Sequence, residues 1–162
     1  MRDRADFERY VGQRSARLLR MAYLLCRDWA TAEDLTQIAL AKAWLAWRRV
    51  GDNPDAYVYR ILVNTHNSWW RRMWKREVPT DALPDVTDPG AEDTLGDRDV
   101  LRVALAGLPP GMRAVLVLRY FEDLSDAEIA AILRCSEGTV RSQASRALAK
   151  LRVDPAMDWS RR

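Results

Sequence analysis

The sequence predicts an all-α protein, in which two small helical domains are joined by a flexible acidic linker. Apolar residues recur at helical spacing in two long stretches, and no pair of strand-like segments is visible between or within them. A segment rich in proline and acidic residues separates these stretches. The predicted divisions are a first domain at 1–76, a linker at 77–98, a second domain at 99–152 and a tail at 153–162.

The net charge differs between three segments of the chain that correspond to the two predicted domains and the linker. Residues 1–76 carry a net charge of +7, residues 77–100 carry −7, and residues 101–162 carry +3. The chain has 162 residues, of which 48% are apolar and 30% charged, so it can build real cores and is not disordered throughout. Two basic bodies joined by an acidic strip are typical of modules that bind a polyanion.

The cysteine content points to a reducing compartment. Cys26 and Cys135 are the two cysteines, and they form no C-x-x-C pair, which argues against a disulfide framework and a zinc site. The start of the chain has no apolar signal-like core, and no run is long enough to span a membrane. We therefore expect a cytoplasmic protein with no cofactor, no metal and no membrane insertion.

Two helices are predicted before the first loop. Apolar positions at helical spacing indicate a helix from Asp6 to Cys26. After a short turn, Thr31 is the predicted N-cap of a second helix, with Asp34 three residues later in a capping-box arrangement. Trp47 is placed at the edge of the core stripe of this helix. The stripe consists of Leu35, Ile38, Ala39, Ala43 and Ala46.

A tight loop then leads into a helix with two different faces. The Gly51–Pro54 loop combines four residues that favour turns, and Pro54 is suited to the first turn of the helix at 54–76. One face should enter the core through Val58, Leu62, Thr65, Trp69 and Met73. The opposite face and its border carry amide, guanidinium, ammonium and indole groups, on Arg60, Asn64, Asn67, Trp70, Arg71, Trp74 and Lys75. Such groups stack on unpaired bases and neutralise phosphates, although a core anchor beside a solvated charged face is the competing interpretation.

The second domain contains the sharper pattern. A helix ending near Pro109 is followed by a short helix around 112–120, whose apolar run also resembles a buried strand. Ser125 and Glu128 form a capping box that opens a further helix, and Ser136 caps the next one after a turn of helix-turn-helix length. The outer face of the last helix carries small, hydroxyl and guanidinium groups suited to a DNA major groove, on Gly138, Arg141, Ser142, Ser145, Arg146 and Ala149. An ordinary helical hairpin with a polar face is the less favoured alternative.

Both domains resemble those of a known family. Ala32–Leu35 with Gln37, then Asp55–Tyr57 with Asn64, resemble the second domain of extracytoplasmic-function sigma factors of the sigma-70 family. Ser125–Ala130 and Gly138–Ser142 resemble their fourth domain. The resemblance covers nearly the whole chain in the same order, and it is closest to the small two-domain members.

The resemblance implies a sigma factor that binds core RNA polymerase and directs promoter-specific transcription initiation. Asp34, Leu35 and Gln37 would then bind the clamp helices of the polymerase. The first domain would recognise and melt the −10 element through Asp52, Asn53, Arg60, Asn64, Asn67, Trp70, Arg71, Trp74 and Lys75. The second domain would contact the polymerase flap and the −35 duplex through Gly138, Thr139, Arg141, Ser142, Ser145 and Arg146. The acidic linker would run through the RNA exit channel, and an anti-sigma partner is implied.

Two departures and two alternatives accompany this interpretation. Ile38 stands where the family usually has Glu, and Gln143 stands where it usually has Arg.

One alternative is a helix-turn-helix regulator that is not a polymerase subunit, but it leaves the Trp-rich helix and the linker unexplained. The other is an enzyme, which we do not expect, because His66 is the only histidine and has no Cys or carboxylate pair beside it. Solvated linker charge explains Asp85, Asp88, Glu92 and Asp93 better than a cation site does.

Overall fold

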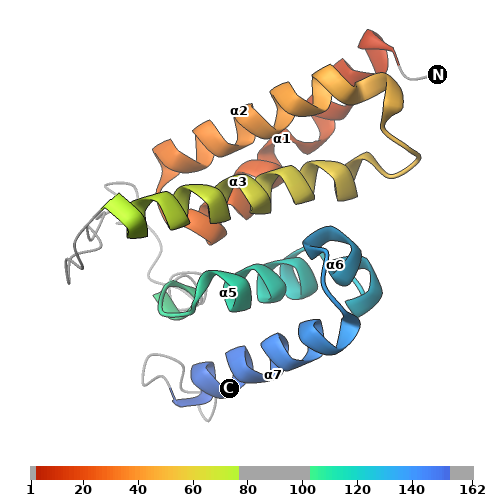
Figure 1. Cartoon of the computed structure of the whole chain (residues 1–162). Coiled ribbons are helices and arrows are strands. Elements are labelled where there is room, and N and C mark those ends of the chain that lie inside the picture. Colours follow the sequence, from red (N-terminus) through yellow and green to blue (C-terminus); the bar gives the residue numbers. More distant parts are fainter. Residues whose placement is uncertain (1–2, 77–102, 154–162) are drawn as a thin grey trace. The chain divides into compact units, whose positions relative to one another are not determined.

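The computed structural model describes residues 3–76 and 103–153, apart from the side chains of 73–76 and 153. The chain divides into two compact units, Met1–Asp85 and Val86–Arg162. Every regular element among the described residues is helical, which confirms the predicted all-α fold (Figure 1). The predicted linker at 77–98 lies outside the described residues, and the exact domain boundaries stay predictions.

The first unit is a bundle of three long helices. Helix α1 (Arg4–Cys26) packs against α2 (Trp29–Ala46), and α3 (Pro54–Arg76) packs against both (Figure 1). A short 3₁₀ turn, η1 (Trp47–Arg49), ends α2 before the loop. The helix predicted at 54–76 is confirmed at both ends. It begins at Pro54 because the loop before this residue breaks the chain, as its composition predicts.

The starts of α1 and α2 are fixed by aspartate caps. Asp3 and Asp6 form a capping box at α1, so this helix begins two residues earlier than predicted. The predicted cap at Thr31 is wrong. Asp28 caps α2 instead, and its carboxylate accepts a hydrogen bond from the Thr31 N–H at 3.1 Å. A carboxylate three residues upstream of Thr31 competes better for the free N–H groups than the Thr31 hydroxyl, which itself donates to Asp28.

Trp47 is a core residue and not the edge residue that the helical period predicts. It is 2% exposed, and its ring meets Phe7 at 5.1 Å and Tyr10 at 5.3 Å between ring centroids. The 3₁₀ turn explains the difference, since a tighter turn rotates its side chains away from the direction that an α-helix would give them. Leu35, Ala39 and Ala43 of the predicted stripe are fully buried.

The second unit is built on a central apolar segment that is helical, not a strand. Residues 103–106 form a helical turn, α5 (Pro110–Leu116) follows, and η3 (Val117–Phe121) continues it with π-type geometry. All residues from Arg113 to Leu118 are buried, so an uninterrupted apolar run here marks a helix surrounded by its neighbours. Helix α6 (Asp126–Leu133) and helix α7 (Glu137–Val153) complete the unit, and α7 packs on both α5 and α6.

Arg113 is buried inside this unit and closes the end of the first helical turn. It is 6% exposed, and its guanidinium donates to the carbonyl oxygens of Leu105 (2.8 Å), Ala106 (3.2 Å) and Leu108 (2.8 Å). Carbonyls at a helix end have no partner within the helix, so they need donors from elsewhere. One planar cation thus replaces the hydrogen bonds that the break at Pro109 removes.

The helix-turn-helix forms as its capping residues predict. Ser125 and Glu128 make a capping box at the start of α6. Arg134 ends α6 in the left-handed region (φ 55°), and the Cys135 N–H donates back to the Ala130 carbonyl at 3.1 Å. The Thr139 N–H then donates to Ser136 Oγ at 3.0 Å, which confirms Ser136 as the cap of α7.

Candidate nucleic-acid interfaces

The outer face of α7 is exposed along its first three turns. Buried small and branched residues hold the helix on the unit, and these are Val140, Ala144, Ala147 and Leu151. The residues predicted to meet the −35 duplex are all exposed, namely Gly138, Thr139, Arg141, Ser142, Ser145 and Arg146. Because most of them are small, the backbone of α7 can approach a groove closely while two guanidinium groups extend beyond it.

Two of these side chains already have partners within α7. Ser136 Oγ and Thr139 Oγ1 lie 2.9 Å apart, so the Thr139 hydroxyl is part of the helix cap. Arg141 and Glu137 form an ion pair at 3.7 Å, and both side chains are more than half exposed. Such a pair contributes little in water. The Arg141 guanidinium can therefore exchange the Glu137 carboxylate for a phosphate or a guanine edge at small cost.

Helix α3 turns a polar face outwards and an apolar face inwards. Asn64 and Arg71 are exposed, whereas Arg60, Asn67 and Trp70 are half-buried. The side chains of Trp74 and Lys75 lie outside the described residues. The predicted core positions Val58, Leu62 and Thr65 are buried, and so are three residues that the predicted stripe omits, Tyr59, Val63 and His66. The buried stripe is thus wider than predicted, and His66 belongs to it rather than to the polar face.

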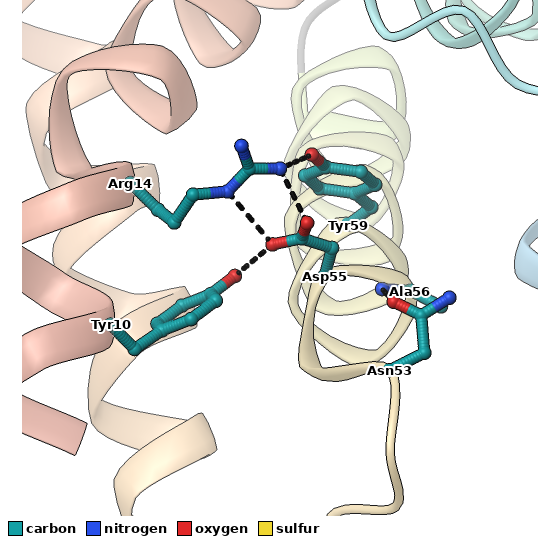
Figure 2. Close-up of polar contacts among 6 residues, drawn as sticks. All are labelled: Tyr10, Arg14, Asn53, Asp55, Ala56 and Tyr59. Carbon is teal, nitrogen blue, oxygen red and sulfur yellow. Dashed lines mark hydrogen bonds and ion pairs between the residues drawn. The ribbon is translucent and has the colours of Figure 1, made fainter. Parts of the chain in front are cut away.

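The loop before α3 is exposed between two fixed ends. Gly51, Asp52 and Asn53 are exposed. On one side, Val50 is buried, and its N–H donates to the carbonyls of Ala46 (3.1 Å) and Trp47 (3.3 Å). On the other side, Asn53 Oδ1 accepts a hydrogen bond from the Ala56 N–H at 3.2 Å (Figure 2). Asn53 is therefore the side-chain cap of α3, and the loop is a short arch with a hydrogen-bonded residue at each end.

Asp55, in the first turn of α3, binds two side chains of α1. Figure 2 shows the Tyr10 hydroxyl donating to Asp55 Oδ1 at 2.8 Å and Arg14 Nε donating to the same oxygen at 3.1 Å. Arg14 Nη2 donates to Asp55 Oδ2 and also to the Tyr59 hydroxyl oxygen, at 2.8 Å in the second case. The Arg14 and Asp55 side chains are about 30% exposed, so water screens this pair only in part.

Burial and hydrogen bonding act on the pKa values of Tyr10 and Arg14. Burial, followed by the hydrogen bond to Asp55, raises the pKa of the Tyr10 phenol above its ordinary value. Burial alone would lower the pKa of Arg14, but the hydrogen bond to Asp55 and the nearby Tyr59 and Asp55 raise it overall. Tyr10 thus remains a donor and Arg14 a cation at any pH in the neutral range.

Helix α2 presents a mixed polar and apolar stripe. Asp34 and Gln37 are exposed, as a partner contact requires. Leu35 is not, because it has no exposed surface and packs inside the bundle. The direct partner contact of Leu35 stays a prediction, and in this structure Leu35 packs in the core beneath the exposed residues of α2. Leu45 lies on the same side of the helix as Asp34 and Gln37, at helical spacing from them, and is 81% exposed.

Comparison with known proteins assigns the family. The model of sigma-70 region 2 matches residues 10–76, and the model of sigma-70 region 4 matches residues 98–151. The RNA polymerase sigma-E factor of Streptomyces coelicolor is 42% identical over 151 residues, which cover 92% of this chain and 85% of that protein. The chain belongs to the extracytoplasmic-function group of the sigma-70 family.

Other sigma factors support the same assignment. The ECF RNA polymerase sigma factor SigE of Mycolicibacterium smegmatis is 32% identical, over 91% of this chain and 60% of that protein. Among solved structures, the sigma factor RpoE of Bartonella quintana, in complex with the anti-sigma factor NepR, superposes with a TM-score of 0.73. It is 28% identical, and the match covers 92% of this chain and 98% of that one. This protein is thus an RNA polymerase sigma factor.

The matched regions contain both exposed surfaces described above. The region 2 match includes α2, the Gly51–Asn53 arch and α3, and the region 4 match includes α6 and α7 up to Leu151. Within the part of the chain that the structure describes, no three His, Cys, Asp or Glu side chains gather as metal ligands would. The same residues include no helix that is both long and apolar enough to cross a bilayer.

Sequence reasoning missed two features of this sigma factor. Leu45 could have been found from its spacing, since Asp34, Gln37, Ala41 and Leu45 fall on one helical stripe. The cluster of Tyr10, Arg14 and Asp55 had no comparable signal, because Asp55 is more than forty residues away from the other two. Only the packing of α1 against α3 brings them together.

Proposed function

We propose that this sigma factor binds core RNA polymerase in the cytoplasm and directs promoter-specific initiation, as a subunit without enzymatic activity of its own. The observation that carries the proposal is the presence, in order, of both sigma regions, each with an exposed face suited to its DNA target. A helix-turn-helix regulator that acts without polymerase is not favoured, since it leaves the region 2 match without a role.

The second unit would bind the −35 element as intact duplex. Helix α7 enters a major groove with its small residues against the base edges, and Arg141 and Arg146 bond guanine or phosphate oxygens. Ser142 and Ser145 are exposed on the same helix and would bond phosphates. The Ser136 cap supports this role, because it fixes the start of the helix that carries these groups. We expect the same unit to contact the polymerase flap.

The first unit would recognise and open the −10 element. Extruding a base costs a few kcal/mol, so the protein must offer contacts that exist only when the strand is open. Trp70 and Trp74 are the proposed stacking groups, and Asn64 and Asn67 bond base edges. Arg60, Arg71 and Lys75 bind phosphates. Asp52 and Asn53 of the exposed arch would form the pocket for an extruded base.

Helix α2 would bind the clamp helices of the polymerase. Asp34 and Gln37 supply the polar contacts, and Leu45 adds a large apolar side chain to the same exposed stripe. Ile38, where relatives usually have Glu, is half-buried and makes this stripe less acidic. The acidic linker at 77–98 would follow the RNA exit channel.

An anti-sigma protein is the proposed regulator. RpoE of Bartonella quintana was solved with the anti-sigma factor NepR, and that sigma factor matches almost all of this chain. A partner of this kind would silence the protein by covering the exposed faces of α2 and α7. Its identity follows from isolating the proteins that bind the full chain in its own host.

Run-off transcription tests the proposed function. The full chain is added to core polymerase with fragmented genomic DNA, and the start sites of the products are aligned. We expect products that share two upstream sequence blocks at fixed spacing. Co-purification with core polymerase separates this proposal from the regulator alternative. If the chain binds DNA but never associates with core polymerase, the proposal that it acts as a sigma subunit is refuted.

A further inference from the structure

The Gly51–Asn53 arch owes its position to α1 as well as to α3. Its second end is the cap at Asn53, and Asp55 follows two residues later. The Asp55 carboxylate accepts hydrogen bonds from Tyr10 and from two nitrogens of Arg14, so α1 grips the first turn of α3 through both carboxylate oxygens. A bidentate Arg–carboxylate pair fixes orientation as well as distance.

The hydrogen bonds between α1 and Asp55 are more specific in direction than the packing of α1 against α3 requires. The bundle already joins α1 to α3 through an apolar core that includes Leu18, Val58 and Leu62. A partly buried ion pair often adds no more stability than apolar residues of similar size would. The hydrogen bonds of the cluster, unlike apolar packing, have a preferred direction, so they favour one rotation of α3 relative to α1.

We propose that Arg14 and Asp55 are positioning residues for −10 recognition, which hold the Gly51–Asn53 arch in the geometry that selects an extruded base. This inference rests on the proposed −10 role of the arch. Neither residue needs to touch DNA. Each acts through Asn53 and the first turn of α3, so that the recognising groups are ordered before the base arrives.

The chain offers a matched control for this effect. Arg4 and Glu8 also form an ion pair on α1, at 2.8 Å, but both side chains are mostly exposed and the pair lies within one helix. Arg4→Gln removes a charge and an ion pair of α1 without touching the link to α3. Arg14→Gln and Asp55→Asn break that link, and Arg14→Lys keeps the charge with only part of the hydrogen bonding.

The measurement is base discrimination, not strand opening alone. The full chain and core polymerase open a promoter that carries a fluorescent base in the −10 element. The opening rate on this promoter is divided by the opening rate on templates with single −10 substitutions, and this quotient is the discrimination ratio. We expect Arg14→Gln and Asp55→Asn to reduce this ratio about tenfold, the effect of one charge-assisted hydrogen bond. Arg14→Lys should recover part of the ratio, and Arg4→Gln should equal the parent protein.

Each outcome has a distinct meaning. If the parent protein opens no promoter with core polymerase, the proposed function fails, and this inference fails with it. If the parent opens promoters and both link-breaking variants keep its discrimination ratio, the positioning role is overturned while the proposed function stands. Lower thermal stability with an unchanged ratio also overturns it, because the cluster would then serve stability alone. If Asp55→Asn does not fold, the ratio of the Arg14 variants decides.

Discussion

At the scale of the residue, Arg113 shows how one buried cation organises the second unit. Its guanidinium is 6% exposed and donates to three backbone carbonyls near the break at Pro109. Truncating it would leave these buried acceptors without their donor, which costs more than the hydrogen bonds contribute when they are made. No apolar side chain can replace this arrangement.

Arg113→Met should therefore destabilise the second unit by about 3 kcal/mol. Urea unfolding of the full chain, followed by circular dichroism, measures this change. Arg152→Met is the control, because Arg152 is exposed near the end of α7 and should cost less than about 0.5 kcal/mol. Equal effects of the two variants would contradict the role assigned to Arg113.

Trp70 is the residue whose proposed role depends most on the open strand. It is half-buried on α3, so part of its ring is accessible to a base. Trp70→Ala should slow open-complex formation by about fivefold to a hundredfold, which corresponds to the loss of one stacked base. Permanganate reactivity of unpaired thymines measures opening, and binding to core polymerase should be unchanged. Trp70→Phe keeps an aromatic face, so its rate of opening should lie between those of the parent protein and Trp70→Ala. Normal thymine reactivity with the alanine variant would refute the stacking role.

At the scale of the element, α6 depends on its N-cap residue, Ser125. Ser125 accepts from the Glu128 N–H at 3.1 Å, and Glu128 reaches back to the Ser125 N–H at 3.4 Å. In a helix of eight residues, a cap satisfies a large share of the free N–H groups. Ser125→Ala should thus lower the free energy of unfolding by about 1 kcal/mol. Ser125→Asp keeps a capping oxygen and should retain most of the stability in the same denaturation assay, and a loss equal to that of alanine would argue against capping.

Helix α7 presents Arg141 on a face whose other members are mostly small. Arg141→Ala should weaken binding of a −35 duplex by about 1–3 kcal/mol and, if the contact is to phosphate, lower the salt slope by about one. Titration of a labelled duplex at several salt concentrations measures both quantities. Lys150→Ala removes a charge from the same helix near its far end and serves as the comparison. Unchanged affinity for Arg141→Ala would mean that another face of α7 meets the DNA.

At the scale of the whole molecule, the separated charges predict how promoter binding responds to salt. Residues 1–76 and 101–162 are both basic, whereas 77–100 are acidic. If both units bind phosphates, a full promoter should release more counterions than a −35 duplex alone. With core polymerase present in both titrations, the slope of log affinity against log salt should be steeper for the full promoter. Equal slopes would show that only one unit binds DNA electrostatically.

Local patterns in the sequence were sufficient to predict most of the fold. Helical periodicity located α1, α2, α3 and α7, because each has an apolar stripe long enough to outweigh other signals. Capping chemistry located the turn between α6 and α7, since Ser125 and Ser136 act only on residues close to them. The predictions failed where two local signals competed, as at Thr31 and Asp28, or where the helix type changed, as at Trp47.

The sequence by itself determined the separation of charge, which follows from composition. It also determined the helices, the caps of α6 and α7 and the exposed face of α7, because these depend on residues within about four positions of one another. Only the tertiary structure decided that the Trp47 ring meets Phe7 in the core and that Arg14 holds Asp55. The physical reason is the distance along the chain. A contact between residues that are forty positions apart exists only after the apolar stripes have packed, and it leaves no periodic signal in the sequence.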